Sequence, residues 1–162
     1  MTRQKLKMKV LYSIIFLEEN MDNSIFEGFS DWLDKILEAN SFDKVLAFNF
    51  NLYEGITGTK EEWHIQLIGC DEFDEQDQDW ACSEIFTTEE NLFIMEKRVA
   101  GKKWFEALDF SIKIVTEYLE NGKNKDILLE KQAVGIGFVD GDLYIIYNNG
   151  KVDKNIKVEH DF

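Results

Sequence analysis

The sequence predicts an α+β fold, with a largely antiparallel sheet and two amphipathic helices packed on one face of it. Apolar residues recur at three- and four-residue spacing in segments 24–38 and 103–121, as they do along one side of a helix. In several shorter runs they alternate with polar residues, which is typical of half-buried strands. Turn-rich links join these runs more often than helices do, which indicates hairpins and not parallel βαβ units.

The size and charge of the chain limit the classes of function. Its 162 residues are the length of one domain, without proline or an internal repeat, so we expect a single domain over residues 1–162. Hydrophobic residues make up 44% of the chain, enough for a continuous core, and the formal charge is −14. This charge opposes binding to nucleic acid or an anionic membrane and favours a basic partner. The alternative is that acidity only keeps the protein soluble.

The N-terminus shows a pattern that superficially resembles a signal peptide. Four basic residues precede an apolar run at 10–17, but the run contains Tyr12 and Ser13 and meets Glu18 without a small-residue cleavage site. No stretch approaches the roughly 18 apolar residues that span a bilayer, so we expect a cytoplasmic protein. Within this region, residues 8–16 alternate well enough to predict a strand, with a short helix as the alternative.

The first clear helix covers residues 24–38. Ser24 and Glu27 form a capping box at its start. Residues 44–53 then alternate strictly and predict a strand, and residues 63–70 predict its antiparallel neighbour after a turn-rich link.

Two more short strands are expected at 83–87 and 92–97, followed by a second helix over 103–121 that Gly122 is placed to end. We expect both helices to bury their apolar sides against one face of the sheet. The predicted core comprises Phe29, Trp32, Leu33, Ile36, Leu108, Ile112 and Val115 from the helices and Phe48, Phe50, Ile65, Leu67, Phe138 and Ile145 from the strands.

A hairpin is predicted over residues 133–147. Its turn contains Asp140-Gly141, whose tolerance of positive φ suits a type I′ turn. Gly135 and Gly137 lie inside its first strand, where glycine marks a close approach of backbone. Asn149-Gly150 is expected to turn the chain into a last strand that includes Val152, Ile156 and Val158.

The densest charge in the chain lies between two predicted strands. Six of the nine residues from 71 to 79 are acidic, and Cys70 and Trp80 flank them. Charges packed this closely repel one another, so a basic surface would relieve the repulsion, and an exposed Trp80 would supply an apolar anchor. The alternative is a solvated loop without a partner. The predicted partner-binding residues are Asp71, Glu72, Asp74, Glu75, Asp77, Asp79 and Trp80.

No motif predicts catalysis. His64 and His160 have no sequence-evident nucleophile or metal-ligand partner, and Gly135-Ile136-Gly137 lacks the third glycine and the helix of a dinucleotide fingerprint. With 32 acidic residues in the chain, a pair of candidate catalytic carboxylates carries almost no information. We therefore predict no enzyme activity, no catalytic residue and no cofactor.

Metal binding is the main rival interpretation of the acidic loop. An EF-hand register that starts at Glu75 places Trp80 where glycine is required and Phe86 where the bidentate glutamate belongs. We therefore predict no metal site, with a non-specific divalent-cation site as the alternative. Cys70 and Cys82 match no zinc spacing and read as reduced thiols.

Several segments together resemble a known class of protein. They are the tryptophan strand at 63–70, the acidic run ending in Asp79-Trp80-Ala81-Cys82, a helix, and the hairpin sequence GIGFVDGDL at 135–143. Over roughly residues 22–148, this arrangement resembles small bacterial immunity proteins encoded beside polymorphic or contact-dependent toxins. The resemblance implies that the chain binds and neutralises a cognate toxin domain, often a basic nuclease. The alternatives are an acidic nucleic-acid mimic or adaptor, and a small enzyme.

Overall fold

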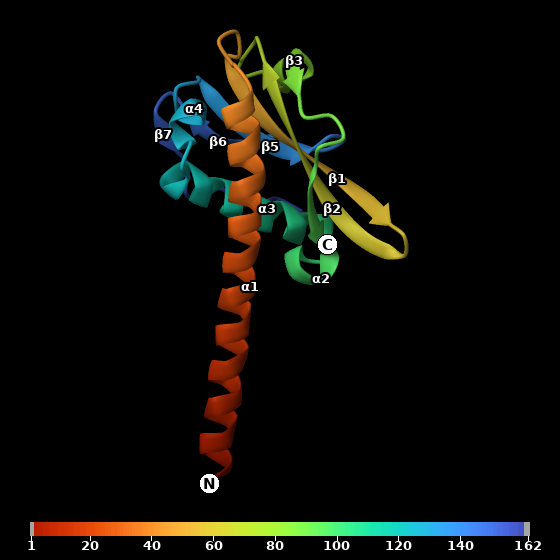
Figure 1. Cartoon of the computed structure of the whole chain (residues 1–162), viewed down its shortest axis with the longest axis vertical. Coiled ribbons are helices and arrows are strands. Elements are labelled where there is room, and N and C mark those ends of the chain that lie inside the picture. The colour runs from red at the N-terminus through yellow and green to blue at the C-terminus, as the bar shows by residue number, and fades with distance from the viewer. Residues whose placement is uncertain (1, 161–162) are drawn as a thin grey trace.

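The structure is a computed structural model that describes residues 2–160, and the side chains of these residues apart from 14 and 16–22. Helices and strands combine in an α+β fold (Figure 1). Its elements are α1 (Arg3–Ala39), β1 (Ala47–Thr57), β2 (Lys60–Cys70), the 3-10 helix η1 (Gln78–Cys82), β3 (Glu84–Thr87), β4 (Phe93–Glu96), α2 (Lys97–Ala100), α3 (Trp104–Asn121), α4 (Lys125–Leu129), β5 (Ala133–Phe138), β6 (Tyr144–Asn148) and β7 (Lys151–Val152).

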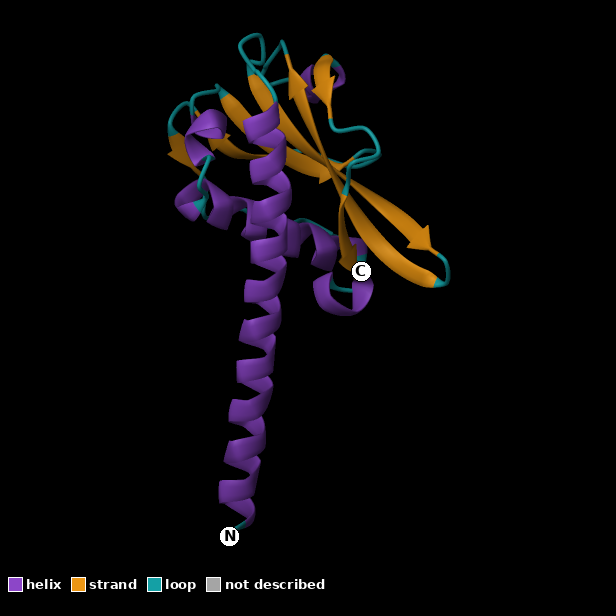
Figure 2. Ribbon diagram, viewed as in Figure 1, coloured by secondary structure: helices purple, strands orange, loops and turns teal. Residues whose placement is uncertain are grey.

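All the strands belong to one sheet of order β3-β2-β1-β5-β6-β7, in which β4 also pairs with β2. The sheet is mostly antiparallel, as predicted, because its strands are joined largely by hairpins and short loops. The exception is the central pair, β1 and β5, which run parallel. The chain between them passes through β2, β3, β4 and the helices α2, α3 and α4 before it returns to the centre of the sheet (Figure 2).

Strand β1 lies at the centre of the sheet and carries the core on one face. Its alternation places Phe48, Phe50 and Leu52 on the side of the helices, where each is fully buried. The strand was expected from residue 44 with Leu46 on the same apolar face. It begins instead at Ala47, and Leu46 is 45% exposed.

The C-terminal part of α1 and the whole of α3 pack on this face, as predicted, and contribute to one core cluster (Figure 2). The rings of Phe29 and Tyr118 meet edge to face at 6.2 Å. The Tyr118 hydroxyl donates a hydrogen bond to Asp34, and the Asn124 side-chain amide donates to the same carboxylate at 3.1 Å. Burial and this carboxylate raise the pKa of Tyr118, so the hydroxyl that ties α1 to α3 remains a donor.

Most of the predicted core is buried, with Trp32 and Phe138 packed at its edge and partly buried. The prediction for Ile145 is wrong, because this side chain lies on the opposite face of the sheet. A shift in the register of β5 with β6 interrupts the alternation, so that Ile146 and Tyr147 both join the helix-side core.

The strand predicted at residues 8–16 is also wrong, since α1 runs without a break from Arg3. The Thr2 hydroxyl accepts the helix-capping hydrogen bond from the Lys5 amide at 3.4 Å, and Ser24 lies inside the helix. The N-terminal half of α1 extends away from the sheet (Figure 1). It has no neighbouring strand to pair with, and its backbone groups bond to one another within the helix. Its exposed apolar side chains are Leu6, Met8, Val10, Leu11, Tyr12 and Ile15.

The turns of the C-terminal region differ from the prediction at one position. Asp140 and Gly141 do not have positive φ, so the expected type I′ turn is absent there, and residues 139–143 form a longer loop. Positive φ occurs instead at Asn149 (48°) and Gly150 (85°), in the tight turn between β6 and β7. The last strand is only Lys151–Val152, and beyond it Ile156 and Val158 pack against the core from an irregular tail.

Replacing Phe50 with alanine is expected to lower the free energy of unfolding by about 3–5 kcal/mol, because the ring is fully buried between sheet and helices. Leu46→Ala, at an exposed position just before the same strand, should change it by less than about 0.5 kcal/mol. Equilibrium unfolding in urea measures both. If both variants lowered the free energy of unfolding by the same small amount, the assignment of this face as the core would be wrong.

Candidate functional site

The acidic loop, residues 71–79, follows β2 and includes the first two residues of η1, and the residues that anchor it pack on the sheet face opposite the helices. Trp80 follows it and is only 3% exposed, so its ring cannot be the exposed anchor that we predicted. The ring packs in a second, smaller core and meets Phe73 at 5.3 Å. This second core comprises Ala47, Ile68, Cys70, Trp80 and Ala133, with Phe73, Ala81, Leu143 and Ile145 packed against it.

The six acidic side chains of the loop are all exposed, as predicted. Two of them also shape its backbone. A carboxylate oxygen of Asp74 accepts from the Gln76 amide at 2.9 Å, and one of Asp77 accepts from the Asp79 amide at 3.0 Å. These are the local side-chain to backbone bonds by which aspartate orders turns. The loop is therefore shaped by its own carboxylates and held to the sheet through Trp80.

A second acidic loop lies against the first. It is the β5–β6 loop, residues 139–143, which contains Asp140 and Asp142. The side-chain carbonyl of Gln78 accepts a hydrogen bond from the Leu143 amide at 3.2 Å, which joins the two loops. Together they carry eight carboxylates and no cationic residue, and none of the salt bridges found among residues 2–160 involves any of them. We call this pair of loops the acidic surface.

Two glycines of β5 allow this arrangement, as the sequence indicated. A Cβ atom on Gly135 would lie 2.6 Å from the side-chain oxygen of Asn49 and 3.2 Å from the ring of Trp80. A Cβ atom on Gly137 would lie 2.5 Å from the Asp142 carbonyl oxygen. Glycine therefore lets Trp80 pack onto the sheet and lets the β5–β6 loop fold back on its own strand.

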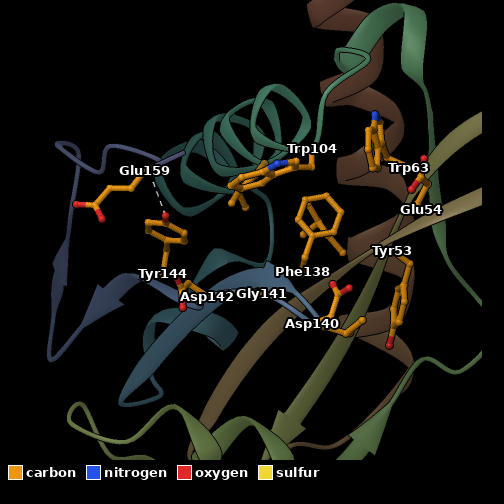
Figure 3. A pocket seen from close by; sticks show the side chains of 13 residues that line it. Tyr53, Glu54, Trp63, Trp104, Phe138, Asp140, Gly141, Asp142, Tyr144 and Glu159 are labelled. Carbon is orange, nitrogen blue, oxygen red and sulfur yellow. Dashed lines mark hydrogen bonds between the residues drawn. The ribbon is translucent and has the colours of Figure 1, made fainter. Parts of the chain in front are cut away.

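The structure also forms a pocket of about 570 Å³ that the sequence analysis did not identify. It lies where β5 ends at Phe138, paired with Leu52, while β1 continues to Thr57 (Figure 3). We call it the aromatic pocket. Its lining residues are Leu52, Tyr53, Glu54, Trp63, Trp104, Leu108, Phe138, Val139, Asp140, Gly141, Asp142, Tyr144 and Glu159.

Aromatic rings form the wall of this pocket. Phe138 lies between Trp63 and Trp104, meeting them edge to face at centroid distances of 5.5 and 6.4 Å (Figure 3). The Trp63 indole donates to the Gly101 carbonyl at 2.7 Å, and the Tyr144 hydroxyl accepts from the Glu159 amide at 3.2 Å. These bonds fix two of the rings in place. The Trp104 side chain, in contrast, is 45% exposed at the start of α3.

Charge is distributed unevenly around the aromatic pocket. Beside Trp63, the Lys97 ammonium lies 4.5 Å from the ring centroid and forms an ion pair with Glu54. The Glu54 carboxylate is thus neutralised from within the chain. Asp140 and Asp142, on the β5–β6 loop, have no such partner among the described residues.

The other titratable groups show structural roles. Burial raises the pKa of the Cys70 thiol to about 12, and nearby Glu84 adds to the effect, so Cys70 remains an unreactive thiol. Hydrogen bonds from Thr57 and His64 lower the pKa of Glu62, which keeps this carboxylate charged next to the imidazole at 3.1 Å. Among the side chains that the structure describes, no group of three or more His, Cys, Asp or Glu is arranged to hold a metal ion.

Comparison with known proteins yields no relative. No protein-family model matches the chain, and no curated sequence or solved structure is similar to it at a significant level. No helix in the described part of the chain combines the length and apolar character needed to cross a membrane.

Trp80→Ala should lower the free energy of unfolding by about 3–5 kcal/mol, because it empties the second core. Trp104→Ala, at the exposed tryptophan, is the matched control and should cost less than about 1.5 kcal/mol. Urea unfolding followed by circular dichroism compares the two without depending on tryptophan fluorescence. A small decrease in the free energy of unfolding for both variants would show that Trp80 does not support the acidic loop.

Proposed function

We propose that this protein is an immunity-type inhibitor that binds and neutralises a basic toxin domain through its acidic surface. The observation that carries the proposal is the pair of abutting loops with eight carboxylates and no salt bridge among the described residues. The resemblance of segments 63–82 and 135–143 to immunity proteins supports the class of partner.

The energetics of these loops favour a cationic partner. Each additional like charge raises the electrostatic free energy of its neighbours, and a basic surface converts that repulsion into attraction and accelerates encounter. A toxin that acts on nucleic acid presents such a surface, because it must neutralise phosphates. An inhibitor that covers this surface prevents nucleic acid from binding there, because it repels the phosphates and occupies their space.

The alternative of a nucleic-acid mimic or adaptor uses the same charge in another arrangement. A mimic would spread its carboxylates as a stripe with the spacing of phosphates. The acidic surface instead gathers them on two loops, at 71–79 and 139–143, that a single hydrogen bond joins. This localised arrangement favours a compact protein–protein interface.

Neutralising four loop carboxylates should slow association with the toxin by about tenfold at low salt and flatten the salt dependence of the rate. Asparagine retains the turn-forming oxygens of Asp74 and Asp77, so folding should be unchanged. The test variant is D74N/E75Q/D77N/D79N. Its control is E27Q/D31N/E90Q/E130Q, which removes the same charge at exposed positions outside both loops.

The measurement is binding kinetics at two salt concentrations against the product of the neighbouring reading frame, with rescue of growth from that product as the cellular readout. We expect the control to bind and rescue like the unmodified protein. A loop variant with an unchanged association rate and full rescue would show that the acidic loop is only a solvated surface and that recognition occurs elsewhere.

A further inference from the structure

We infer that the aromatic pocket receives an arginine side chain of the partner, an inference that rests on the proposed function and specifies its point of insertion. The pocket combines aromatic rings with carboxylates on a concave surface of about 570 Å³. This pairing suits a cation, because ring faces attract positive charge and the carboxylates supply hydrogen-bond acceptors. A purely apolar ligand would contact the rings but make no use of the carboxylates.

Guanidinium is the cation that fits this wall best. It is planar, stacks on aromatic faces and is more weakly hydrated than ammonium, so it loses less on leaving water. Its fork of donors can reach a carboxylate while its plane lies against a ring. Trp104 offers a half-exposed ring for the plane, and Asp140 and Asp142 carry the carboxylates (Figure 3).

The protein already uses the same chemistry at one side of the pocket. There Lys97 lies over Trp63 at 4.5 Å and pairs with Glu54. The cation–π contacts formed among the described residues place a cation on Trp63 and on Phe105, and neither involves Trp104. Trp104, Asp140 and Asp142 all line the pocket, and none of them forms a cation–π contact or a salt bridge with a cation of residues 2–160.

The position of the pocket connects it with the acidic surface. The β5–β6 loop forms part of the pocket wall and also lies against the loop at 71–79, through the Gln78–Leu143 hydrogen bond. The pocket is lined from the helix side of the sheet and the loop at 71–79 lies on the other side, so the β5–β6 loop is the segment that links the two. This continuity favours a side chain of a macromolecular partner over a free small cation.

The first experiment tests the pocket without the toxin. The probe is the peptide Ac-Gly-Arg-Gly-NH2, titrated into protein labelled with nitrogen-15, and the readout is the four indole N–H signals in a proton–nitrogen correlation spectrum. We expect saturable shifts for Trp63 and Trp104, with a dissociation constant of about 1 mM. Trp32 and the buried Trp80 lie outside the pocket and serve as internal references.

Two variants assign the contacts. W104A and D140N/D142N should each weaken peptide binding by about tenfold, and the second should also reduce its salt dependence. I94A and E27Q/E90Q are the controls, which remove an exposed apolar side chain and two exposed carboxylates elsewhere. Both controls should bind the peptide as the unmodified protein does. Far-ultraviolet circular dichroism establishes that each variant is folded.

Three outcomes would overturn the inference. The first is the absence of shifts at Trp63 and Trp104, and the second is equal shifts with the neutral peptide Ac-Gly-Gln-Gly-NH2. The third is tighter binding of tetramethylammonium than of the arginine peptide, which would make the pocket a site for a small quaternary cation.

The toxin experiment separates this inference from the proposed function. If the pocket binds the arginine peptide but the neighbouring gene product does not bind the protein, the inhibitor function is wrong while the arginine site stands. If the toxin binds and W104A and D140N/D142N dissociate at the unmodified rate, the arginine inference is wrong while the inhibitor function stands. We expect both variants to dissociate about tenfold faster.

Discussion

The pairing of β1 on both of its edges is the constraint on which the rest of the structure depends. Its antiparallel register with β2 and its parallel register with β5 place Phe48, Phe50 and Leu52 under the helices. The same registers place Ala47 in the second core. A one-residue slip would exchange the two faces, so neither core can form without this alignment. The pocket has the same origin, because β1 continues past the end of β5 and the β5–β6 loop folds across the step.

The two cores differ in what they support. The larger one joins α1 and α3 to the sheet and fixes the overall fold, whereas the smaller one holds a loop that would otherwise be driven outward by its own charge. Trp80 is the largest side chain there, and Gly135 leaves room for its ring. The acidic loop thus presents a defined surface to a partner, which reduces the ordering cost of binding.

The sequence predicted those features that depend on local periodicity. The helix at 103–121 and the strands at 44–53 and 63–70 lie close to their predicted positions, since each buries a periodic apolar face in the larger core. The predictions failed where contacts with distant segments of the chain decide the structure. The segment at 8–16 has no strand to pair with, and the bulge in the β5–β6 ladder moves Ile145 to the other face. Alternation in a sequence does not reveal whether a neighbouring strand exists, as at 8–16, or where a bulge shifts the register, as at Ile145.

The same limit applied to the site. The carboxylates of the acidic loop could be predicted because they are contiguous, but the burial of Trp80 depends on strands far from it in sequence. The aromatic pocket brings together side chains from β1, β2, α3, β5 and the tail. In the sequence, Trp104 is indistinguishable from a core residue at the start of a helix. The one local signal was Asp140-Gly141-Asp142, an acidic turn directly after an apolar strand.

Charge and shape have different consequences for recognition in this protein. Eight carboxylates would attract many basic proteins, since long-range attraction raises association rates with little regard to the identity of the partner. Discrimination requires a contact that only one partner completes, and a concave site with fixed rings and unpaired carboxylates penalises any partner that leaves those groups unsatisfied. The short β5–β6 loop belongs to both the acidic surface and the pocket wall, so a partner that contacts this loop lies next to the pocket.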